Sequence, residues 1–292
     1  MRGTDSGVVL GLYRSRCKRR LLEDALSLGV RKIDTSYNYH GFRAHEILSK
    51  RAGDLLGDFD ISTKVGFFRT SNGFEHSLSP SRLRQAVEEA VEQLGIPPAV
   101  IFLHNPEHTL TGLNPAYGQA LLAAACTSLE EAASDGLCQS WGIASWNPIP
   151  LLRLFTDRYN STLPAPKILM LRSGLTVNAA TLAAGEALTQ NFALTPEARW
   201  GMSPFGGSST DPIWHQIDTR IFLPPSERDC SYLQAAFRVS FHLPNVSRVA
   251  VGTDRTDHLH ELLAATERSV NAAAVTRYRH LLSKRKTRNL SQ

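Results

Sequence analysis

Short apolar runs alternate with longer amphipathic stretches along almost the whole chain. Stretches with apolar residues at helical spacing predict helices at residues 17–28, 44–52, 79–94, 118–134, 179–190 and 230–241, and one that begins near His258. The apolar runs predict buried strands at residues 8–11, 59–64, 99–103, 167–171, 199–202 and 248–251, with two further strands that end at Asp34 and near Ala144. Eight strand–helix units in alternation, without an internal sequence repeat, favour an α/β fold with a parallel sheet.

The segment between residues 66 and 77 interrupts this pattern, because it is polar and glycine-bearing and carries Phe67, Phe68 and Phe74. It predicts a loop after the third strand. Loops that follow strands often carry binding residues, so this one is a candidate wall of a substrate pocket.

One domain accounts for the length of 292 residues, since a parallel α/β barrel typically has about 250. The composition, 42% hydrophobic and 20% charged, is near the average of globular proteins and excludes a disordered or fibrous chain. We therefore predict a single barrel domain over residues 1–275 and a basic tail over residues 276–292.

The net charge of +5 originates in that tail. No acidic residue follows Glu267, whereas the last sixteen residues hold six basic ones: Arg277, Arg279, Lys284, Arg285, Lys286 and Arg288. Removing these six charges from +5 leaves −1 for the rest of the chain. A solvated helix end with a frayed terminus explains such a tail, and we predict no nucleic-acid partner.

No apolar run approaches the ~18 to 20 residues of a membrane span, and no secretory core follows the first six residues. We expect a soluble, cytoplasmic protein without a membrane partner. The four cysteines, Cys17, Cys126, Cys138 and Cys230, are scattered without a CxxC pair. They predict buried thiols and neither a disulfide framework nor a metal site.

Ionisable side chains stand at the ends of three successive predicted strands, at Asp34, Lys64 and His104. The loop after Asp34 carries Tyr39 to the same rim. In barrel enzymes the carboxyl ends of the parallel strands meet at one face, which holds the active site. Each residue alone could cap or pack a loop, but all four at these positions indicate one site.

The same segments resemble the motifs of the aldo-keto reductases. Residues 29–41, GVRKIDTSYNYHG, are similar to the family segment G-x-x-x-h-D-T-A-x-x-Y-G, where h is hydrophobic. STKVG at 62–66 and LHNP at 103–106 resemble the family's lysine and histidine strands, and GLCQSWGIAS at 136–145 resembles its G-K-x-R-x-I-G-V-S-N turn and strand. The resemblance extends from about residue 7 to residue 265 and implies a (β/α)8 TIM barrel. The family usually begins with a hairpin that plugs the bottom of the barrel, which we expect to be reduced or absent here.

The resemblance implies an oxidoreductase that interconverts an aldehyde or ketone and the matching alcohol, with Asp34, Tyr39, Lys64 and His104 as its catalytic tetrad. A nicotinamide hydride can reduce a carbonyl only if the growing alkoxide receives a proton, which Tyr39 would donate. Lys64 would lower the pKa of the phenol from its usual value of about 10. Asp34 would hold Lys64 in place, and His104 would hydrogen-bond the carbonyl oxygen. In the reverse direction Tyr39 would be the base.

Residues expected at the dinucleotide lie in the second half of the chain. A glycine–serine loop directly after a strand offers backbone N–H groups to a pyrophosphate, at Ser203, Phe205, Gly206 and Gly207. A second segment leads into a helix whose free N–H groups form an anion site, at Gly252, Thr253, Asp254, Arg255 and His258. Other positions depart from the family pattern: Ser145 replaces the carboxamide-binding Asn, Met170 a Gln, Met202 the stacking aromatic residue, and His258 and Leu262 the adenine-side residues.

Thr253 and Arg255 could take the 2′-phosphate of NADPH, whereas Asp254 between them could bind a free ribose hydroxyl and favour NADH. We favour NADPH, the family's commoner partner. The substrate pocket is expected at His40, Phe68, Trp146 and Trp214. The strand motifs look most like the aldose and sugar dehydrogenase branch, so we expect a small carbonyl substrate that is hydroxylated or sugar-like; a biosynthetic intermediate is equally compatible.

Other functions remain open. A cofactor-sensing regulatory subunit with little turnover would suit the departures at Met170 and Met202, whereas the intact tetrad argues against it. An epimerase that retains its nicotinamide is a further alternative. A metal-dependent hydrolase would need clustered ligands at a strand end, and His104 stands alone; we predict no metal. We expect a monomer or a weak homo-oligomer.

Overall fold

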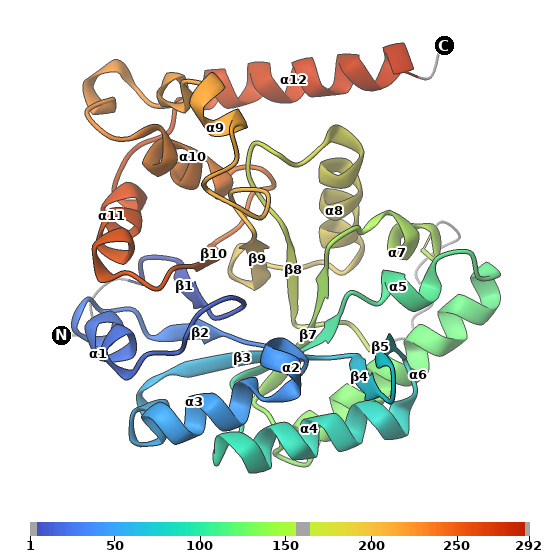
Figure 1. The fold of residues 1–292 in the computed structure, drawn as a ribbon. Helices are drawn as coiled ribbons and strands as arrows, with labels where there is room; N and C mark the ends of the chain where they lie inside the picture. Colours follow the sequence, from blue (N-terminus) through green and yellow to red (C-terminus); the bar gives the residue numbers. More distant parts are fainter. Residues whose placement is uncertain (1–4, 156–163, 290–292) are drawn as a thin grey trace.

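Eight parallel strands close into a barrel in the order β1-β10-β9-β8-β7-β6-β3-β2 (Figure 1). The computed structural model describes residues 5–155 and 164–289, and the side chains as far as residue 284. The barrel strands are β1 (Val8–Gly11), β2 (Lys32–Asp34), β3 (Asp60–Val65), β6 (Val100–His104), β7 (Ser140–Ser145), β8 (Ile168–Arg172), β9 (Arg199–Met202) and β10 (Arg248–Gly252). This closed barrel confirms the predicted (β/α)8 fold.

Helices surround the barrel and follow its strands along the chain (Figure 1). The α-helices are α1 (Arg19–Ser27), α2 (Tyr39–Phe42), α3 (Ala44–Ala52), α4 (Pro80–Leu94), α5 (Glu107–Leu110), α6 (Pro115–Ser134), α7 (Ile149–Arg153), α8 (Ala179–Asn191), α9 (Ile213–Gln216), α10 (Tyr232–Ser240), α11 (Thr256–Thr266) and α12 (Ala272–Asn289). Short 3-10 helices are η1 (Gly53–Asp58), η2 (Pro196–Ala198), η3 (Thr219–Phe222) and η4 (Pro225–Glu227).

Local chemistry explains where the longer helices begin and end. Helix α4 starts with Pro80, whose fixed φ suits the first turn, and stops at Gly95, which adopts a left-handed φ of 75°. Helix α10 begins with a capping box, in which Ser231 and Gln234 satisfy each other's backbone N–H groups. These signals are local, so the sequence predicts both helices well.

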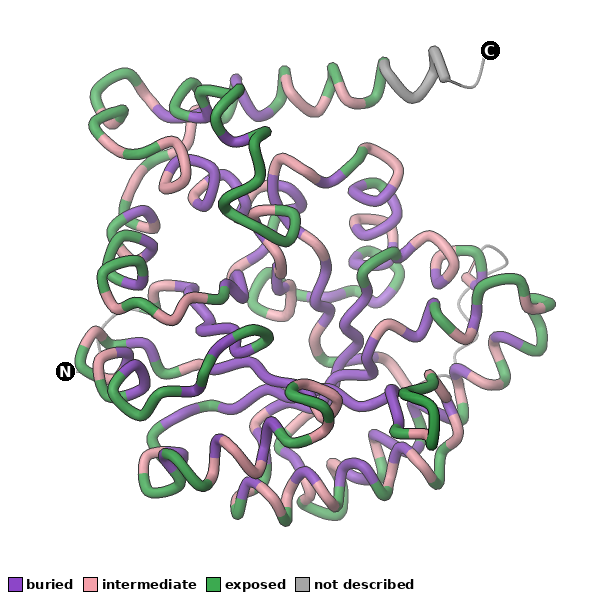
Figure 2. Tube along the Cα trace, in the orientation of Figure 1, coloured by how far each residue is buried: buried purple, intermediate pink, exposed green. Residues whose placement is uncertain are grey.

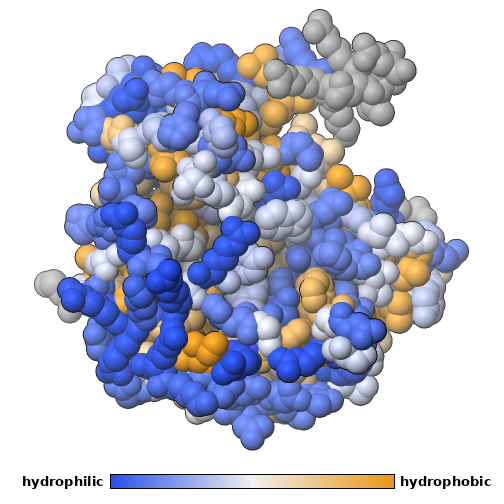
Figure 3. All heavy atoms as spheres, viewed as in Figure 1, coloured by the Kyte–Doolittle hydropathy of each residue, from blue (hydrophilic) through white to orange (hydrophobic). Residues whose placement is uncertain are grey.

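Alternate residues of each strand point into the barrel and away from it. The inward ones form an apolar plug in the middle of the barrel: Val9, Val100, Phe102, Ala144, Met170, Trp200 and Ala250. Outward residues such as Ile101 and Leu169 pack with the surrounding helices instead. Figure 2 shows this arrangement as strands that are buried along most of their length and helices that are buried on one side. Figure 3 shows hydrophilic residues prevailing on the outer surface of the same view, with hydrophobic patches between them.

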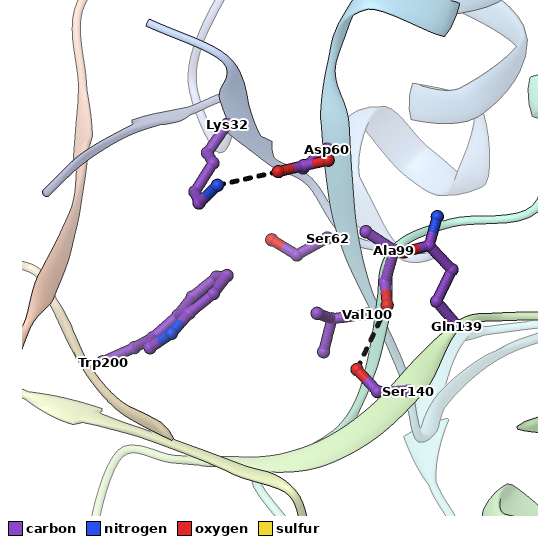
Figure 4. A pocket seen from close by; sticks show the side chains of 8 residues that line it. All are labelled: Lys32, Asp60, Ser62, Ala99, Val100, Gln139, Ser140 and Trp200. Atoms are coloured by element: carbon purple, nitrogen blue, oxygen red, sulfur yellow. Dashed lines mark hydrogen bonds and ion pairs between the residues drawn. The ribbon is translucent and has the colours of Figure 1, made fainter. Parts of the chain in front are cut away.

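The amino end of the barrel is polar and holds a pocket of about 160 Å³ (Figure 4). On one side of it Lys32 Nζ lies 2.7 Å from the Asp60 carboxylate, and Trp200 faces them across the space. Asp5 reaches the same end, 2.8 Å from Arg248. Before β1 the structure describes residues 5–7, which form no strand. The expected reduction or absence of the N-terminal hairpin also depends on residues 1–4, which lie outside the described residues, so it stays a prediction.

The segment after β3 differs from the predicted loop, since it is a β-hairpin of β4 (Phe67–Thr70) and β5 (Gly73–His76). A two-residue turn at Ser71 and Asn72 joins the strands, and Gly73 follows with a φ of 139°. The hairpin makes Phe67 and Phe68 face opposite sides. The Asn72-Gly73 pair is a hairpin signal that the sequence contained.

Helix α12 extends across the predicted boundary between residues 275 and 276. Tyr278 donates a hydrogen bond of 2.5 Å to the Leu175 carbonyl, and Arg279 pairs with Glu186 at 2.5 Å, so this part of the tail is attached to the barrel. The side chains of Arg285, Lys286 and Arg288 lie outside the described residues. In the described part of the chain, no helix has the length and apolar character needed to cross a membrane.

The cysteines form no disulfide among the described residues. Cys17, Cys126 and Cys138 are buried, as predicted, but Cys230 is only partly so. It precedes α10 in an irregular segment, which covers it less completely than a helix packed on the barrel would.

Candidate active site

The structure brings Asp34, Lys64 and His104 together at the carboxyl end of the barrel. Lys64 Nζ donates a hydrogen bond of 2.5 Å to Asp34 and one of 2.8 Å to the Thr35 carbonyl. The other Asp34 oxygen accepts a 2.8 Å bond from Ser62. Strands β2, β3 and β6 are neighbours in the sheet, which is why residues separated by about 30 and 70 positions meet.

Tyr39 lies beside Lys64, whose ammonium is 5.3 Å from the centre of the phenol ring. The ring also contacts His104, at 6.3 Å between centroids. Burial raises the pKa of Tyr39, and the Lys64 ammonium opposes this rise without cancelling it. The net shift therefore differs from the expected lowering, because the loss of solvation outweighs the neighbouring charge. In this state Tyr39 is a protonated phenol at neutral pH.

The charge on Lys64 is secured by its partners. Burial would lower the pKa of Lys64, but the Asp34 carboxylate and Tyr39 outweigh it and hold the pKa above its ordinary value. Burial and then the Lys64 charge lower the pKa of His104 well below its usual range, so this imidazole is neutral. The site thus contains a neutral acid, a compensated ammonium and a neutral imidazole.

His104 is fixed by residues that the sequence motifs did not point to. Its Nδ1 lies 3.1 Å from the Ser36 hydroxyl, which leaves Nε2 for a ligand. Phe67 packs edge-on against the imidazole, with centroids 5.0 Å apart. His76 Nε2 donates a 2.8 Å hydrogen bond to the His104 carbonyl. Side-chain alternation along β4 was the one signal that could have predicted Phe67, and not Phe68, as the phenylalanine beside His104.

The loop after Tyr39 is strained, because His40, Gly41 and Phe42 all have positive φ values, of 51°, 64° and 67°. Such backbone is costly for residues other than glycine and is found at functional sites. His40 is exposed in this loop, and its place in the substrate pocket stays a prediction.

Backbone N–H groups of the 203–209 loop are open to a ligand. The loop follows β9. The backbone N–H groups of Gly207, Ser208 and Ser209 have no hydrogen-bond partner in the part of the chain that the structure describes. A side chain at Gly206 would come within 2.8 Å of the Thr176 hydroxyl, so glycine is required for this close approach. Thr176 Oγ1 is buried and lacks a partner among the described residues. These donors fit a pyrophosphate, with Ser203 and Phe205 at the start of the loop.

The β10–α11 segment is the second predicted nucleotide element. Asp254 accepts hydrogen bonds of 2.6 Å from the Ser15 hydroxyl and 3.0 Å from the Arg16 N–H, which tie it to the loop after β1. Arg255 pairs with Asp257, and its side chain is exposed. Gly252, Thr253 and His258 lie along the same edge, and α11 has no side-chain cap.

Two of the three predicted nicotinamide contacts, Ser145 and Met170, lie away from the open rim. Ser145 is fully buried and donates a 3.0 Å bond to Glu107, since residue 145 points out of the barrel. Met170 belongs to the apolar plug, whereas Met202 packs against the plug, is only partly buried and pairs in register with Arg172. The apolar plug therefore forms the floor beneath the mouth.

The predicted pocket residues divide into two groups. Trp146 is exposed beside the mouth, whereas Phe68 packs in the outer core under Arg82. Trp214 is 1% exposed and donates to the Ser208 carbonyl, so it supports the 203–209 loop from beneath. Tyr13, which was not predicted, contacts Tyr39 at 4.9 Å and is exposed. Its position just after β1 was the available signal.

In the described residues, no group of three or more His, Cys, Asp or Glu side chains could hold a metal ion.

A buried histidine on the outside of the barrel makes the stability of the fold depend on pH. His45 lies 2.7 Å from the Thr63 hydroxyl, and burial lowers its pKa to about 4.

The free energy of unfolding is therefore expected to fall on acidification. A histidine in the unfolded chain has a pKa of about 6.5, so it is protonated below that pH. In the folded protein His45 stays neutral down to about pH 4. This stabilisation is present above pH 6.5 and is lost as the pH falls, by about 2 kcal/mol at pH 5.

Urea unfolding at pH 7 and pH 5 measures this loss. His45→Gln should remove about 2 kcal/mol of the difference, and the exposed His260 replaced in the same way should leave it intact. An unaltered difference in the His45 variant would show that other groups cause the acid sensitivity.

Comparison with known proteins agrees with this geometry. The sequence model of the aldo/keto reductase family matches residues 14–160, just over half of the chain. Over 130 residues, 44% of the chain, the sequence is 30% identical to pyridoxine 4-dehydrogenase from Escherichia coli (strain K12). That stretch spans 44% of the relative's length, less than half of it.

Two solved structures have the same fold across most of the chain. The holo form of an aldo-keto reductase from Bacillus halodurans is similar over 94% of this chain and 91% of its own, with a TM-score of 0.71 and 18% identity. An aldo-keto reductase from Klebsiella pneumoniae in complex with NADPH is similar over 94% of this chain and 90% of its own, with a TM-score of 0.66 and 13% identity. The match to the family model, over the part of the chain that carries Asp34, Tyr39, Lys64 and His104, shows that the chain belongs to the aldo/keto reductase family.

Proposed function

We propose that the protein is an NAD(P)H-dependent oxidoreductase that interconverts an aldehyde or ketone and its alcohol at Tyr39. One observation carries this proposal, namely the convergence of Tyr39, the Asp34–Lys64 pair and His104 at one rim of the barrel. The family membership and the open N–H groups after β9 support it.

The residues divide the work of reduction between them. A bound nicotinamide supplies a hydride to the carbonyl carbon. As the C–O double bond becomes single, the oxygen takes the proton from the Tyr39 hydroxyl, and Lys64 stabilises the phenolate that remains. His104 Nε2–H donates to the carbonyl oxygen in the tautomer that carries its proton on Nε2, and the imidazole is neutral as this role requires. Oxidation of the alcohol reverses each transfer.

NADPH is the preferred cofactor in this proposal. The Asp254 carboxylate, which could repel a 2′-phosphate, is already held by Ser15 and Arg16. Arg255 is exposed next to Asp254, and its guanidinium can leave the ion pair with Asp257 to bind a phosphate. The pyrophosphate would lie on the 203–209 loop.

Absorbance at 340 nm tests the activity and the cofactor together. The protein is expected to oxidise NADPH in the presence of a panel of aldehydes, ketones and aldoses, with a kcat/KM at least about tenfold above that with NADH, because a charge-assisted contact to the 2′-phosphate contributes about 1.5–3 kcal/mol. Nicotinamide binding without turnover on any member of the panel would favour the regulatory-subunit alternative. Cofactor that remains bound on purification and is neither consumed nor exchanged would favour an epimerase.

A further inference from the structure

Arg172 is a cation at the mouth of the barrel that the reaction at Tyr39 does not use. It ends β8, directly after the buried run from Ile168 to Leu171. Along this strand Leu169 and Leu171 pack with the outer helices, whereas Ile168 and Met170 belong to the inner plug. Since strand residues alternate, Arg172 points inward, one layer above Met170.

The register places this layer at the level of the reaction. His104 pairs with Ala144, and Ala144 pairs with Met170, so Arg172 stands two residues further along β8 than the position in register with His104. Strands of a closed barrel are staggered because they tilt against its axis, so the two side chains lie at a similar level. Trp146 lies two residues beyond Ala144 in the same way. The Arg172 guanidinium stacks over the Trp146 ring at 4.6 Å.

Arg172 has no counter-charge among the described residues. It forms no ion pair or hydrogen bond with any residue that the structure describes, and its Nε is fully buried. Other half-buried arginines each donate to an acceptor, as Arg199 does to the Leu194 carbonyl and Arg248 to Asp5. Burial also lowers the pKa of Arg172, as expected for a cation without a compensating carboxylate.

Nearby acids are occupied by other groups. Asp34 compensates Lys64, and the Glu107 carboxylate accepts from the Trp146 and Asn147 N–H groups and from Ser145. Within the described part of the chain, Arg172 is thus a positive charge at the mouth that no carboxylate compensates. A guanidinium with free N–H edges is suited to bidentate binding of a carboxylate or phosphate.

The Arg172 guanidinium lies on the β7 side of the mouth, the side of His104. Its stacking partner Trp146 follows β7, and the Trp146 N–H donates a 3.1 Å hydrogen bond to Asn105, the residue after His104. The 203–209 loop, where the pyrophosphate is proposed, follows β9 on the other side of β8.

We infer that Arg172, stacked on Trp146, binds an anionic group of the substrate, so that the protein acts on carbonyl compounds that carry a carboxylate or a phosphate. The inference rests on the proposed reduction at Tyr39, whose substrate class it names. It narrows the expectation of a hydroxylated or sugar-like substrate to compounds that also carry a negative charge, because a neutral compound would leave a desolvated cation unpaired.

Matched pairs of aldehydes test the inference. 4-Carboxybenzaldehyde and methyl 4-formylbenzoate differ by one charge and share their shape, and glyceraldehyde 3-phosphate and glyceraldehyde provide the phosphate arm. We expect kcat/KM to favour the anion in at least one pair by about 10- to 100-fold, the worth of a charge-assisted hydrogen bond. The pair that responds identifies the anion.

Arg172→Met keeps most of the side-chain volume and removes the charge. It should abolish the preference by raising KM for the anionic aldehyde, with less than about a twofold change for the neutral one and for the Kd of NADPH. Arg172→Lys should restore part of the preference. Arg248→Met is the matched control, since Arg248 also stacks over a tryptophan, at 5.6 Å from Trp200, but at the opposite end of the barrel.

Equal kcat/KM for the members of both pairs would overturn the inference while leaving the proposed reduction intact. Weaker NADPH binding in Arg172→Met with unchanged substrate preference would also overturn it, because the arginine would then belong to the cofactor site.

Calorimetric titration tests the same contact without turnover. The wild-type protein should bind 4-carboxybenzaldehyde at least about tenfold more tightly than the methyl ester, and Arg172→Met should bind both equally. Equal binding by the wild-type protein would reject the arginine as an anion site. Binding as expected with no reduction of any aldehyde would instead count against the function proposed for Tyr39.

Discussion

Tyr39→Phe is expected to lower kcat/KM for carbonyl reduction by about 10²- to 10⁴-fold, the usual contribution of a positioned proton donor. Phenylalanine keeps the ring contacts with Tyr13 and His104 but has no proton to give to the growing alkoxide. Nucleotide affinity should not change, because Tyr39 acts on the carbonyl. Steady-state kinetics at 340 nm and a fluorescence titration with NADPH measure the two quantities separately.

Tyr37→Phe is the control for this substitution. Tyr37 is two residues away, and its hydroxyl donates to Glu89 at 2.5 Å, outside the tetrad. Its loss should reduce stability by about 1.5–3 kcal/mol, because the acceptor is a carboxylate, and should leave kcat/KM per folded molecule within about twofold, because the bond does not touch the reacting atoms. Activity of Tyr39→Phe within tenfold of wild type would remove Tyr39 from its role.

Asp34→Asn should lower the free energy of unfolding by about 3 kcal/mol, because it leaves the Lys64 ammonium buried without a counter-charge. Lys64 and Asp34 are 2% and 7% exposed in their side chains, so water cannot replace the lost partner. Activity should fall as well, since the pKa of Lys64 would lose the charge that holds it above its ordinary value. Urea unfolding at pH 7 measures the stability.

Asp60→Asn is a control at the other end of the same barrel. The distance from Asp60 to Lys32 is 2.7 Å, close to that of the catalytic pair, but the Asp60 side chain is 57% exposed. Lys32 is 18% exposed but also lies 3.8 Å from Asp5, so it keeps a counter-charge, and loss of the exposed partner should cost about 0–1 kcal/mol. Similar losses in the two variants would mean that burial does not set the strength of the Asp34–Lys64 pair.

Much of the barrel could be predicted from local patterns. Helix α3 was predicted with the bounds that it has, and α4 nearly so, because helical spacing and the residues at the ends act within a few positions. The β4–β5 hairpin was missed, because its strands are short and β5 is mostly exposed, so neither has the apolar run of a barrel strand. The weak Asn72-Gly73 signal was the only local trace of it.

The site residues that lie in sequence motifs at strand ends could be predicted, whereas the other site residues could not. Asp34, Lys64 and His104 end strands, and their order in the chain was enough to place them at one rim. Phe67 and Arg172 also follow from strand alternation, but only once the register and the inward face of each strand are known. The pairing of Asp254 with Ser15, 239 positions away, has no counterpart in any local pattern.

The sequence by itself determined the alternation of strands and helices, the ends of the longer helices and the candidate tetrad. These depend on side-chain periodicity and on which residues stand at strand ends, both of which are local properties of the chain. The tertiary structure decided the protonation states and which polar groups are left unpaired. Burial raises the pKa of Tyr39 and keeps His104 neutral, and it leaves Arg172 Nε without a hydrogen-bond partner among the described residues. Solvation and charge pairing depend on every element that packs around a group, so they become defined only when the barrel closes.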